Sequence, residues 1–293
     1  MKRPLVSRVL GRLRERKDPS APALSAPRFG AVDHRLEPPI FIIGCQRSGT
    51  SLLRRILDSH SNIACPPESK FILPMTEVLR APKYLVGFSG MGYERTEVVT
   101  ALRSFLGSFF DAYAAAQGKG RWADKTPNYV ECIPELWELF GPEARFVHLI
   151  RHGMDVAFSL SDDHRHYPAI DEQAALAGGD RAVGAGRHWA IQNELMRAFR
   201  DERPEACFTL RYEDLTRDPE GTLRPMFEFL GEPWEPGVID YASVPHHAGW
   251  EDPDVRRRSR IEPNSGKYSR WPHDVQAAVR AACQPMLAKL GYE

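Results

Sequence analysis

Three short runs of the chain are largely apolar, at residues 40–43, 145–150 and 207–210. Apolar runs of this length are typical of strands that are covered on both faces. Between them, apolar residues recur at helical spacing around residues 98–116, 130–140, 188–199 and 223–230. Strands that alternate with helices predict an α/β fold, a three-layer α/β/α arrangement around a mostly parallel central sheet.

The first apolar run is followed by a loop with two glycines and then by a helical pattern. Such a loop directs backbone N–H groups and the positive end of the helix dipole to one spot, which favours phosphate or sulfate. Gly44 and Gly49 have the spacing of a Walker A loop, but Thr50 stands where that motif carries its lysine. Arg47 supplies a cation inside the loop instead. Taken alone, the loop is also compatible with a tight turn that closes a strand onto a helix.

The second run ends in a cation. Arg151 follows it directly, at the place where a kinase or NTPase tends to carry an aspartate that helps to hold magnesium. A cation there suits an anion that is bound without metal. Ser159, two helical turns further on, can add a hydroxyl donor. The two strand ends therefore predict two anion subsites and a ligand with two separate anionic groups.

The charge balance excludes one class of partner. The chain has 39 basic and 39 acidic residues, whereas a dedicated nucleic-acid binder usually shows a strongly basic domain. Its five cysteines are scattered, without a CxxC pair or a histidine at metal-ligand spacing, so we expect neither zinc nor a disulfide framework. A reducing cytoplasm is the default for such cysteines.

Residues 1–38 have the composition of a disordered tail, rich in proline and alanine and without a strand pattern. The first 17 residues carry seven basic residues and one acidic residue, a net +6 that leaves −6 for the rest. Apolar residues at helical spacing among these charges are compatible with a weak contact to a membrane surface, and a solubilising tail is the other interpretation. Because no run resembles a membrane span or a secretory signal, we expect a cytoplasmic protein, at most peripheral to a membrane. Residues 39–293 are expected to form a single domain.

Several strings, in order along the chain, resemble the sulfotransferases that use 3'-phosphoadenosine 5'-phosphosulfate (PAPS). Residues 42–53 resemble their 5'-phosphosulfate loop, and residues 149–151 with Ser159 resemble their 3'-phosphate motif. A third family segment is similar to residues 210–215 followed by Asp218 and Pro219. The resemblance extends from about Ile40 to Trp271. It implies an enzyme with a P-loop-kinase-like sulfotransferase fold, PAPS as co-substrate and no metal.

The resemblance is closer to tyrosylprotein and to bacterial carbohydrate or natural-product sulfotransferases than to the cytosolic steroid and phenol enzymes. It is carried by the Arg-Ser-Gly-Thr form of the loop, by residues 57–60 with 66–70, and by residues 123–127. In the tyrosylprotein group a glutamate after the first helix is the base, and Glu68 has the matching position. His60 is the competing base.

The resemblance implies a role for each candidate residue. Lys125 would neutralise the leaving oxygen, and Glu68 would remove the acceptor proton. Without the resemblance, Lys125 would be interpreted as a solvated lysine paired with Asp124, on a loop at the edge of the sheet. The residues implied in PAPS binding are Arg47, Ser48, Gly49, Thr50, Ser51, Arg151, Ser159, Tyr212, Ser259, Lys267 and Arg270.

Two alternatives to a PAPS-dependent sulfotransferase stay open at this point: a kinase-like nucleotide-dependent phosphotransferase, and an inactive nucleotide-binding or adaptor module. The acceptor is equally open among a sugar or other glycan, a lipid, a peptide tyrosine and a small secondary metabolite. Residues 71–94 and 164–186 are expected to line its pocket as mobile loops. The sequence predicts no oligomeric state.

Overall fold

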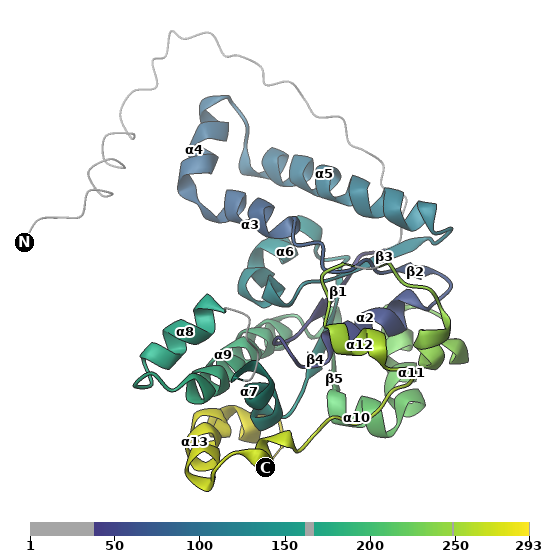
Figure 1. Ribbon diagram of the computed structural model, residues 1–293. Coiled ribbons are helices and arrows are strands. Elements are labelled where there is room, and N and C mark those ends of the chain that lie inside the picture. Colours follow the sequence, from purple (N-terminus) through teal and green to yellow (C-terminus); the bar gives the residue numbers. More distant parts are fainter. Residues whose placement is uncertain (1–37, 162–166, 248, 293) are drawn as a thin grey trace, which may run out of the picture.

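The structure is a computed structural model that describes residues 38–161, 167–247 and 249–292. Its sheet comprises β1 (Ile40–Ile43), β2 (Ile63–Ala64), β3 (Arg121–Lys125), β4 (Arg145–Ile150) and β5 (Cys207–Arg211). The strand order is β2-β3-β1-β4-β5, and every neighbouring pair is parallel (Figure 1). The tail expected over residues 1–38 lies outside the described residues, apart from Pro38.

The helices follow the strands in alternation. They are α2 (Thr50–Asp58), α3 (Ile72–Arg80), α4 (Pro82–Gly90), α5 (Arg95–Ala116), α6 (Ile133–Phe140), α7 (Gly153–Ser161), α8 (Pro168–Ala175), α9 (Arg181–Glu202), α10 (Tyr212–Arg217), α11 (Pro219–Leu230), α12 (Pro253–Arg257) and α13 (His273–Lys289). Short 3-10 helices are η1 (Pro127–Cys132), η2 (Pro204–Ala206), η3 (Pro236–Ser243) and η4 (Lys267–Arg270).

Strand β1 shows why the sequence has no polar alternation there. Phe41 and Ile43 pack on one face of the sheet, in a core with α3, α5 and α6. Ile40 and Ile42 pack on the other face, with α2, α10 and α11. Because both faces are covered, each side chain of the strand is fully buried, and burial stabilises each by about 1.5–3 kcal/mol. This three-layer arrangement confirms the predicted fold class.

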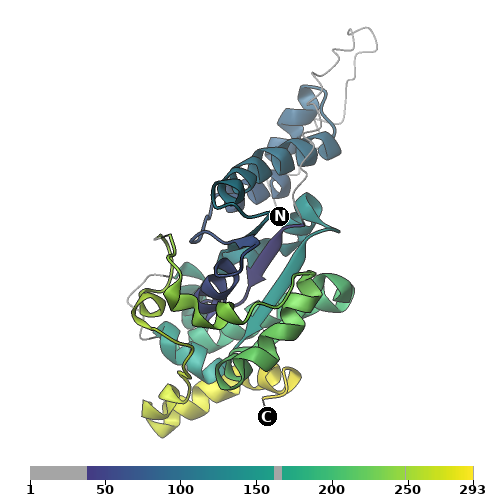
Figure 2. The same ribbon diagram turned by 90° about the vertical axis from the view of Figure 1, so that its right-hand side faces the viewer.

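A third apolar cluster lies beside the carboxyl end of β4. It joins Ile150 to α7, α8, α9 and α13 around the buried Trp189. At the opposite end of the molecule, α4 and α5 extend away from the sheet, as the turned view in Figure 2 shows. No helix in the described ranges is long and apolar enough to cross a membrane.

Three segments differ from the sequence-based expectation. Residues 71–94, expected as mobile loops, form α3 and α4, and Pro82 is accommodated at the first position of α4, where no backbone N–H is needed. Of residues 164–186, also expected as mobile loops, Pro168–Ala175 form α8 and those from Arg181 onward begin α9.

Residues 121–125 were not predicted as a strand, yet they form β3 with every residue buried. Arg121 is buried because it pairs with Glu232 at 3.1 Å. Lys125 is the last residue of this strand, not part of a loop.

Candidate active site

The candidate residues gather at one edge of the sheet because the carboxyl ends of parallel strands all meet there. Lys125 ends β3, and Arg151 and Tyr212 directly follow β4 and β5. The glycine loop follows β1, and Glu68 lies in the turn after β2. Together they line a cavity of about 450 Å³. Strand order therefore sets the order of functional groups across the cavity, from Glu68 at one end to Tyr212 at the other.

The glycine loop needs its two glycines because other chain segments approach closely. A Cβ on Gly44 would lie 2.5 Å from the Leu149 carbonyl oxygen. Gly49 has φ 100°, and a Cβ there would lie 2.6 Å from the Tyr212 ring. Gly49 is the N-cap of α2, so the first amides of this helix, including those of Thr50 and Ser51, have no intrahelical acceptor. The amide of Ser48 already donates to the Cys45 carbonyl at 3.1 Å.

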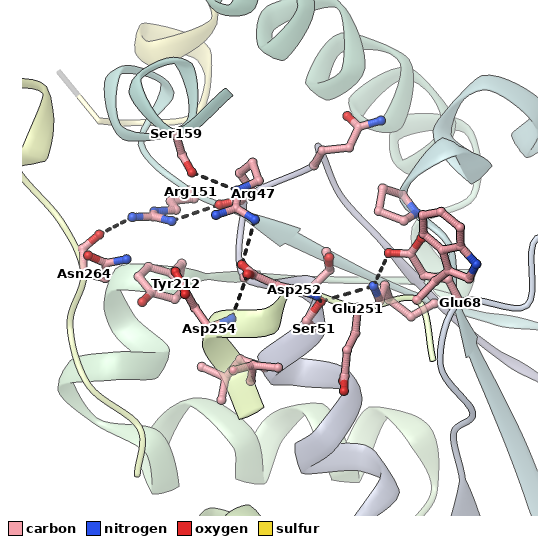
Figure 3. Close-up of a pocket in the computed structure, with 18 of the residues that line it drawn as sticks. Arg47, Ser51, Glu68, Arg151, Ser159, Tyr212, Glu251, Asp252, Asp254 and Asn264 are labelled. Carbon is pink, nitrogen blue, oxygen red and sulfur yellow. Dashed lines mark hydrogen bonds and ion pairs between the residues drawn. The ribbon is translucent and has the colours of Figure 1, made fainter. Parts of the chain in front are cut away.

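Arg47 spans the two predicted anion subsites (Figure 3). Its Nε donates to Ser159 Oγ at 2.8 Å, and its Nη1 pairs with Asp252 Oδ2 at 2.9 Å. The residue has φ 70°, in the left-handed region that costs a non-glycine residue about 1–3 kcal/mol. The loop thus holds this cation in a conformation that the backbone alone would not choose.

Arg151 is buried on the far side of the loop. It donates through Nη1 to the Arg47 carbonyl at 2.9 Å and through Nη2 to the Asn264 carbonyl, and its guanidinium lies 4.5 Å from the Tyr212 ring centre. Arg151 Nε and Ser48 Oγ are buried and have no hydrogen-bond partner among the described residues. A buried donor without a partner costs free energy, so an anion with oxygen acceptors fits this part of the cavity.

Lys125 and Glu68 are in direct contact. Lys125 Nζ donates to Glu68 Oε1 at 2.6 Å and to Ser51 Oγ at 3.2 Å, and only 1% of the lysine side chain is exposed. Lys70 Nζ lies 3.4 Å from the other oxygen of Glu68. The alternative interpretation of Lys125 as a solvated lysine paired with Asp124 is therefore wrong. The candidate base and the lysine expected to neutralise the leaving oxygen are neighbours, and both are close to the start of α2.

Asp124 anchors the turn that carries Glu68. This fully buried carboxylate accepts hydrogen bonds from Ser69 Oγ at 2.7 Å and from the Tyr129 hydroxyl. Burial raises the pKa of Asp124 to about 6, against hydrogen bonds that act in the opposite direction.

In the turn that carries Glu68, Lys70 has φ 58°. The cationic residues Arg47 and Lys70 are the non-glycine residues with positive φ in the described ranges, and both line the cavity.

The segment after α12 contributes other residues than those chosen from the sequence. Arg258, Arg260 and Asn264 line the cavity, whereas Ser259 is exposed between the two arginines and is not among the lining residues. Arg258 and Arg260 belong to the Arg-rich run that the sequence shows. In an extended segment every second side chain points to the same side, and this spacing is the sequence signal that places Arg258 and Arg260 together on the cavity side.

Lys267 and Arg270 lie on η4, away from the cavity lining. The Lys267 amide donates to Asp155 Oδ1 of α7 at 3.1 Å, and the Arg270 guanidinium lies 5.7 Å from the Phe158 ring centre. Their contact with a phosphate stays a prediction. His60, the competing base, is buried against Phe227 with Nε2 2.9 Å from the Pro233 carbonyl, and it does not line the cavity.

Several residues of the cavity were not found by sequence reasoning: Lys70, Trp250, Asp252, Arg258 and Asn264. Trp250 and Asp252 come from a distant loop that carries no motif. Of the segments expected to line an acceptor pocket, residues 164–186 contribute Tyr167 and Pro168 to this cavity, whereas no residue of 71–94 lines it. Residues 162–166 lie outside the described residues. No group of three or more histidine, cysteine or acidic residues in the described chain could hold a metal ion.

The fold and the cavity define a group-transfer enzyme that binds an anionic donor at the carboxyl edge of a parallel sheet. A family model described as the sulfotransferase family matches residues 38–236. Protein-tyrosine sulfotransferase 1 of Danio rerio is 28% identical over 272 residues, which are 87% of this chain and 72% of the zebrafish protein. The chain belongs to the sulfotransferase family.

Solved structures agree with the fold. The sulfotransferase domain from the curacin biosynthetic pathway matches with a TM-score of 0.62 at 22% identity, over 88% of this chain and 99% of that domain. A mouse sulfotransferase in complex with PAP matches with a TM-score of 0.51 at 14% identity, over 87% and 86% of the two chains. The resemblance read from the sequence is thereby confirmed. The protein is an enzyme that transfers a sulfuryl group, which decides against a kinase-like phosphotransferase and an inactive module.

Proposed function

We propose that this sulfotransferase takes its sulfuryl group from PAPS and transfers it to a hydroxyl group, with Glu68 as general base and no metal. The observation that carries the proposal is the contact of Glu68, Lys125 and Ser51 where the glycine loop meets α2. It brings a carboxylate base and a buried cation together at an anion-binding helix terminus. The mouse relative in complex with PAP supports the choice of donor.

The donor would lie along the strand ends. Arg47, Gly49, Thr50 and Ser51 would hold the 5'-phosphate and sulfonate, with the orphaned Ser48 hydroxyl as a further donor. Next to them, Arg151 and Ser159 would hold the 3'-phosphate.

The Tyr212 ring, already stacked on the Arg151 guanidinium, would border the adenosine. Arg258 and Arg260, which also line the cavity, would contribute positive charge. Ser259, Lys267 and Arg270 would reach the donor only if the segment that carries them moves.

The chemical step would be an in-line displacement. The acceptor oxygen attacks sulfur, and its proton passes to Glu68. The bond between sulfur and the bridging oxygen breaks, and the electron pair stays on the leaving 5'-phosphate. Lys125 would turn from Glu68 to this oxygen as charge develops there, and such stabilisation is worth several kcal/mol in a water-poor site. The products are a sulfate ester and PAP.

The acceptor is proposed only by class: a small molecule, a glycan, a lipid or a peptide that offers a hydroxyl. The zebrafish relative is named for protein tyrosine, which supports a peptide tyrosine as one candidate. Trp250, Tyr167 and Pro168 give the cavity an apolar border that can receive any of these. A screen of extracts supplied with PAPS, read by the mass gain of one SO₃ group, would identify the acceptor.

The donor is tested by ligand-induced thermal stabilisation. PAP should raise the melting temperature more than ATP with magnesium does, because a ligand that binds only the folded state stabilises it. The variant Arg151→Lys, which keeps the charge but not the forked geometry, should lose most of its preference for PAP over adenosine 5'-phosphate. Stronger stabilisation by ATP, or an unchanged preference in Arg151→Lys, would contradict the assignment.

A further inference from the structure

A short segment crosses the donor side of the cavity and is tied down at its centre. This segment, residues 249–257, is named the strap here and includes α12. Glu251 in the strap has no exposed side-chain surface. It pairs with Arg55 at 2.9 Å and with Arg54 at 3.5 Å, both in α2, and with Arg256 at 2.7 Å. The strap is thus fixed to the helix that follows the glycine loop.

The first two residues of the strap, Gly249 and Trp250, contact the turn that carries Glu68. The Glu68 amide donates to the Trp250 carbonyl at 3.0 Å. Gly249 packs so closely on Pro67 that a Cβ would lie 2.5 Å from that ring. The strap therefore connects the donor loop with the turn that carries Glu68.

Directly after Glu251, Asp252 reaches into the donor side of the cavity (Figure 3). Its Oδ2 pairs with Arg47 Nη1 at 2.9 Å, and its Oδ1 accepts from the Asp254 amide at 3.1 Å. Its own amide donates to Ser51 Oγ at 3.2 Å. The Asp252 carboxylate is thus paired with the same guanidinium, that of Arg47, which the phosphosulfate group of the donor would require.

The contacts of Asp252 resemble those expected of the donor. A carboxylate, a phosphate and a sulfonate all offer negatively charged oxygens to a guanidinium. If Asp252 stayed in place, it would face the donor's anion at close range, and like charges at an interface oppose binding. While Nε donates to Ser159 and Nη1 pairs with Asp252, the donor's anion would meet a guanidinium whose charge is already partly neutralised.

We infer that Asp252 is an internal anion that occupies Arg47 in the free enzyme and is displaced when the donor binds. The inference rests on the proposed donor site. Donor binding is then an exchange of one anion for another, and Asp252 lowers the affinity for the donor. The strap also contacts the turn that carries Glu68. Replacement of Asp252 by the donor at Arg47 therefore also changes how firmly the strap holds Glu68 in place.

The test uses Asp252→Asn, which removes the charge but keeps the size, the backbone amide and a good helix-capping side chain. Calorimetric titration with PAP should show binding about tenfold tighter than in the wild type. The matched control is Asp218→Asn, which makes the same change of charge at the N-cap of α11, where the side chain accepts from the Gly221 amide outside the cavity lining. This control should bind PAP as the wild type does. In an Arg47→Ala background, Asp252→Asn should bring no gain.

A second measurement does not depend on the donor. In the protein without ligand, hydrogen exchange at the strap amides should be faster in Asp252→Asn than in the wild type and in Asp218→Asn. Equal exchange would overturn the inference, because the ion pair would then not hold the strap. Equal or weaker PAP binding by Asp252→Asn would also overturn it. If the wild type fails to bind PAP, the proposed function fails, and the exchange measurement still judges Asp252.

Discussion

Lys125 is a cation that the fold buries almost completely, with Glu68 as its partner. We expect Lys125→Ala to lower kcat by at least about 100-fold, because loss of one group that stabilises charge in a transition state typically costs this much. The affinity for PAP should change far less, since the lysine acts on the leaving oxygen. Lys83→Ala on the exposed face of α4 is the control. Equal losses in turnover and in PAP affinity would mean that Lys125 only binds the donor.

Glu68 is in contact with Lys125, and its proposed role is to remove the proton of the acceptor hydroxyl. Glu68→Gln keeps the shape and removes the base, so kcat should fall by about 100-fold or more. The acidic limb of the pH–rate profile should disappear with it, a result that a merely structural residue would not give. Exposed Glu77 in α3 supplies the control Glu77→Gln. A profile that keeps its acidic limb in Glu68→Gln would assign the base to another group.

At the scale of the elements, the loop between β1 and α2 depends on Gly49. Gly49→Ala should destabilise the protein by roughly 2–4 kcal/mol, because the new methyl group meets Tyr212 in addition to the strain of a positive φ. Gly118 has φ 69° and open space around it, so Gly118→Ala should cost only about 1 kcal/mol. Urea unfolding of both variants measures the difference. Equal losses would show that the contact with Tyr212 is easily relieved.

The turn after β2 is linked to pH through Asp124 at the end of β3. Its pKa is raised from 3.8 to about 6 in the folded state. Between these two values the folded protein holds a proton that the unfolded chain has lost, so this group's contribution to stability decreases as the pH rises. Asp124→Asn has no such proton.

The stability of Asp124→Asn relative to the wild type should therefore increase by about 1–2 kcal/mol from about pH 5 to about pH 7.5. Urea unfolding at both pH values measures it, and exposed Asp240→Asn should show no such trend. A relative stability that stays constant over this range would mean that Asp124 titrates alike in both states.

The elements differ in how far the sequence predicts them. Strands β1, β4 and β5 are apolar because helices cover both faces, so a local pattern finds them. Strand β3 reads Arg-Trp-Ala-Asp-Lys and is equally buried, but its two cations pair with Glu232 and Glu68, which are far away in the chain. Its aspartate accepts a hydrogen bond from the equally distant Ser69. No local pattern reveals partners of this kind. Residues 71–94 were not expected to be helical for a different reason, their glycine and proline content, of which Pro82 is accommodated at the first position of α4.

At the scale of the whole molecule, the parallel sheet explains which site residues the sequence predicts. Arg151 directly follows a strand and is predicted because all strand ends share one edge. Tyr212 also follows a strand, but only the family resemblance implied its role. Asp252 and Trp250 come from a loop about 200 residues after the glycine loop, and only the folded chain brings them to the cavity. That loop is held by the buried Glu251. Its pairing with Arg54 and Arg55 of α2 could not be predicted from the sequence.

The positive φ angles at Arg47 and Lys70 matter when variants of this protein are selected for stability. Glycine would adopt these two backbone conformations without strain, so the fold would be more stable with glycine there on conformational grounds. Selection for thermostability alone would therefore tend to remove the two cations from the cavity. A stabilised variant of this enzyme has to be chosen by turnover as well as by melting temperature, because two positions of backbone strain line the candidate active site.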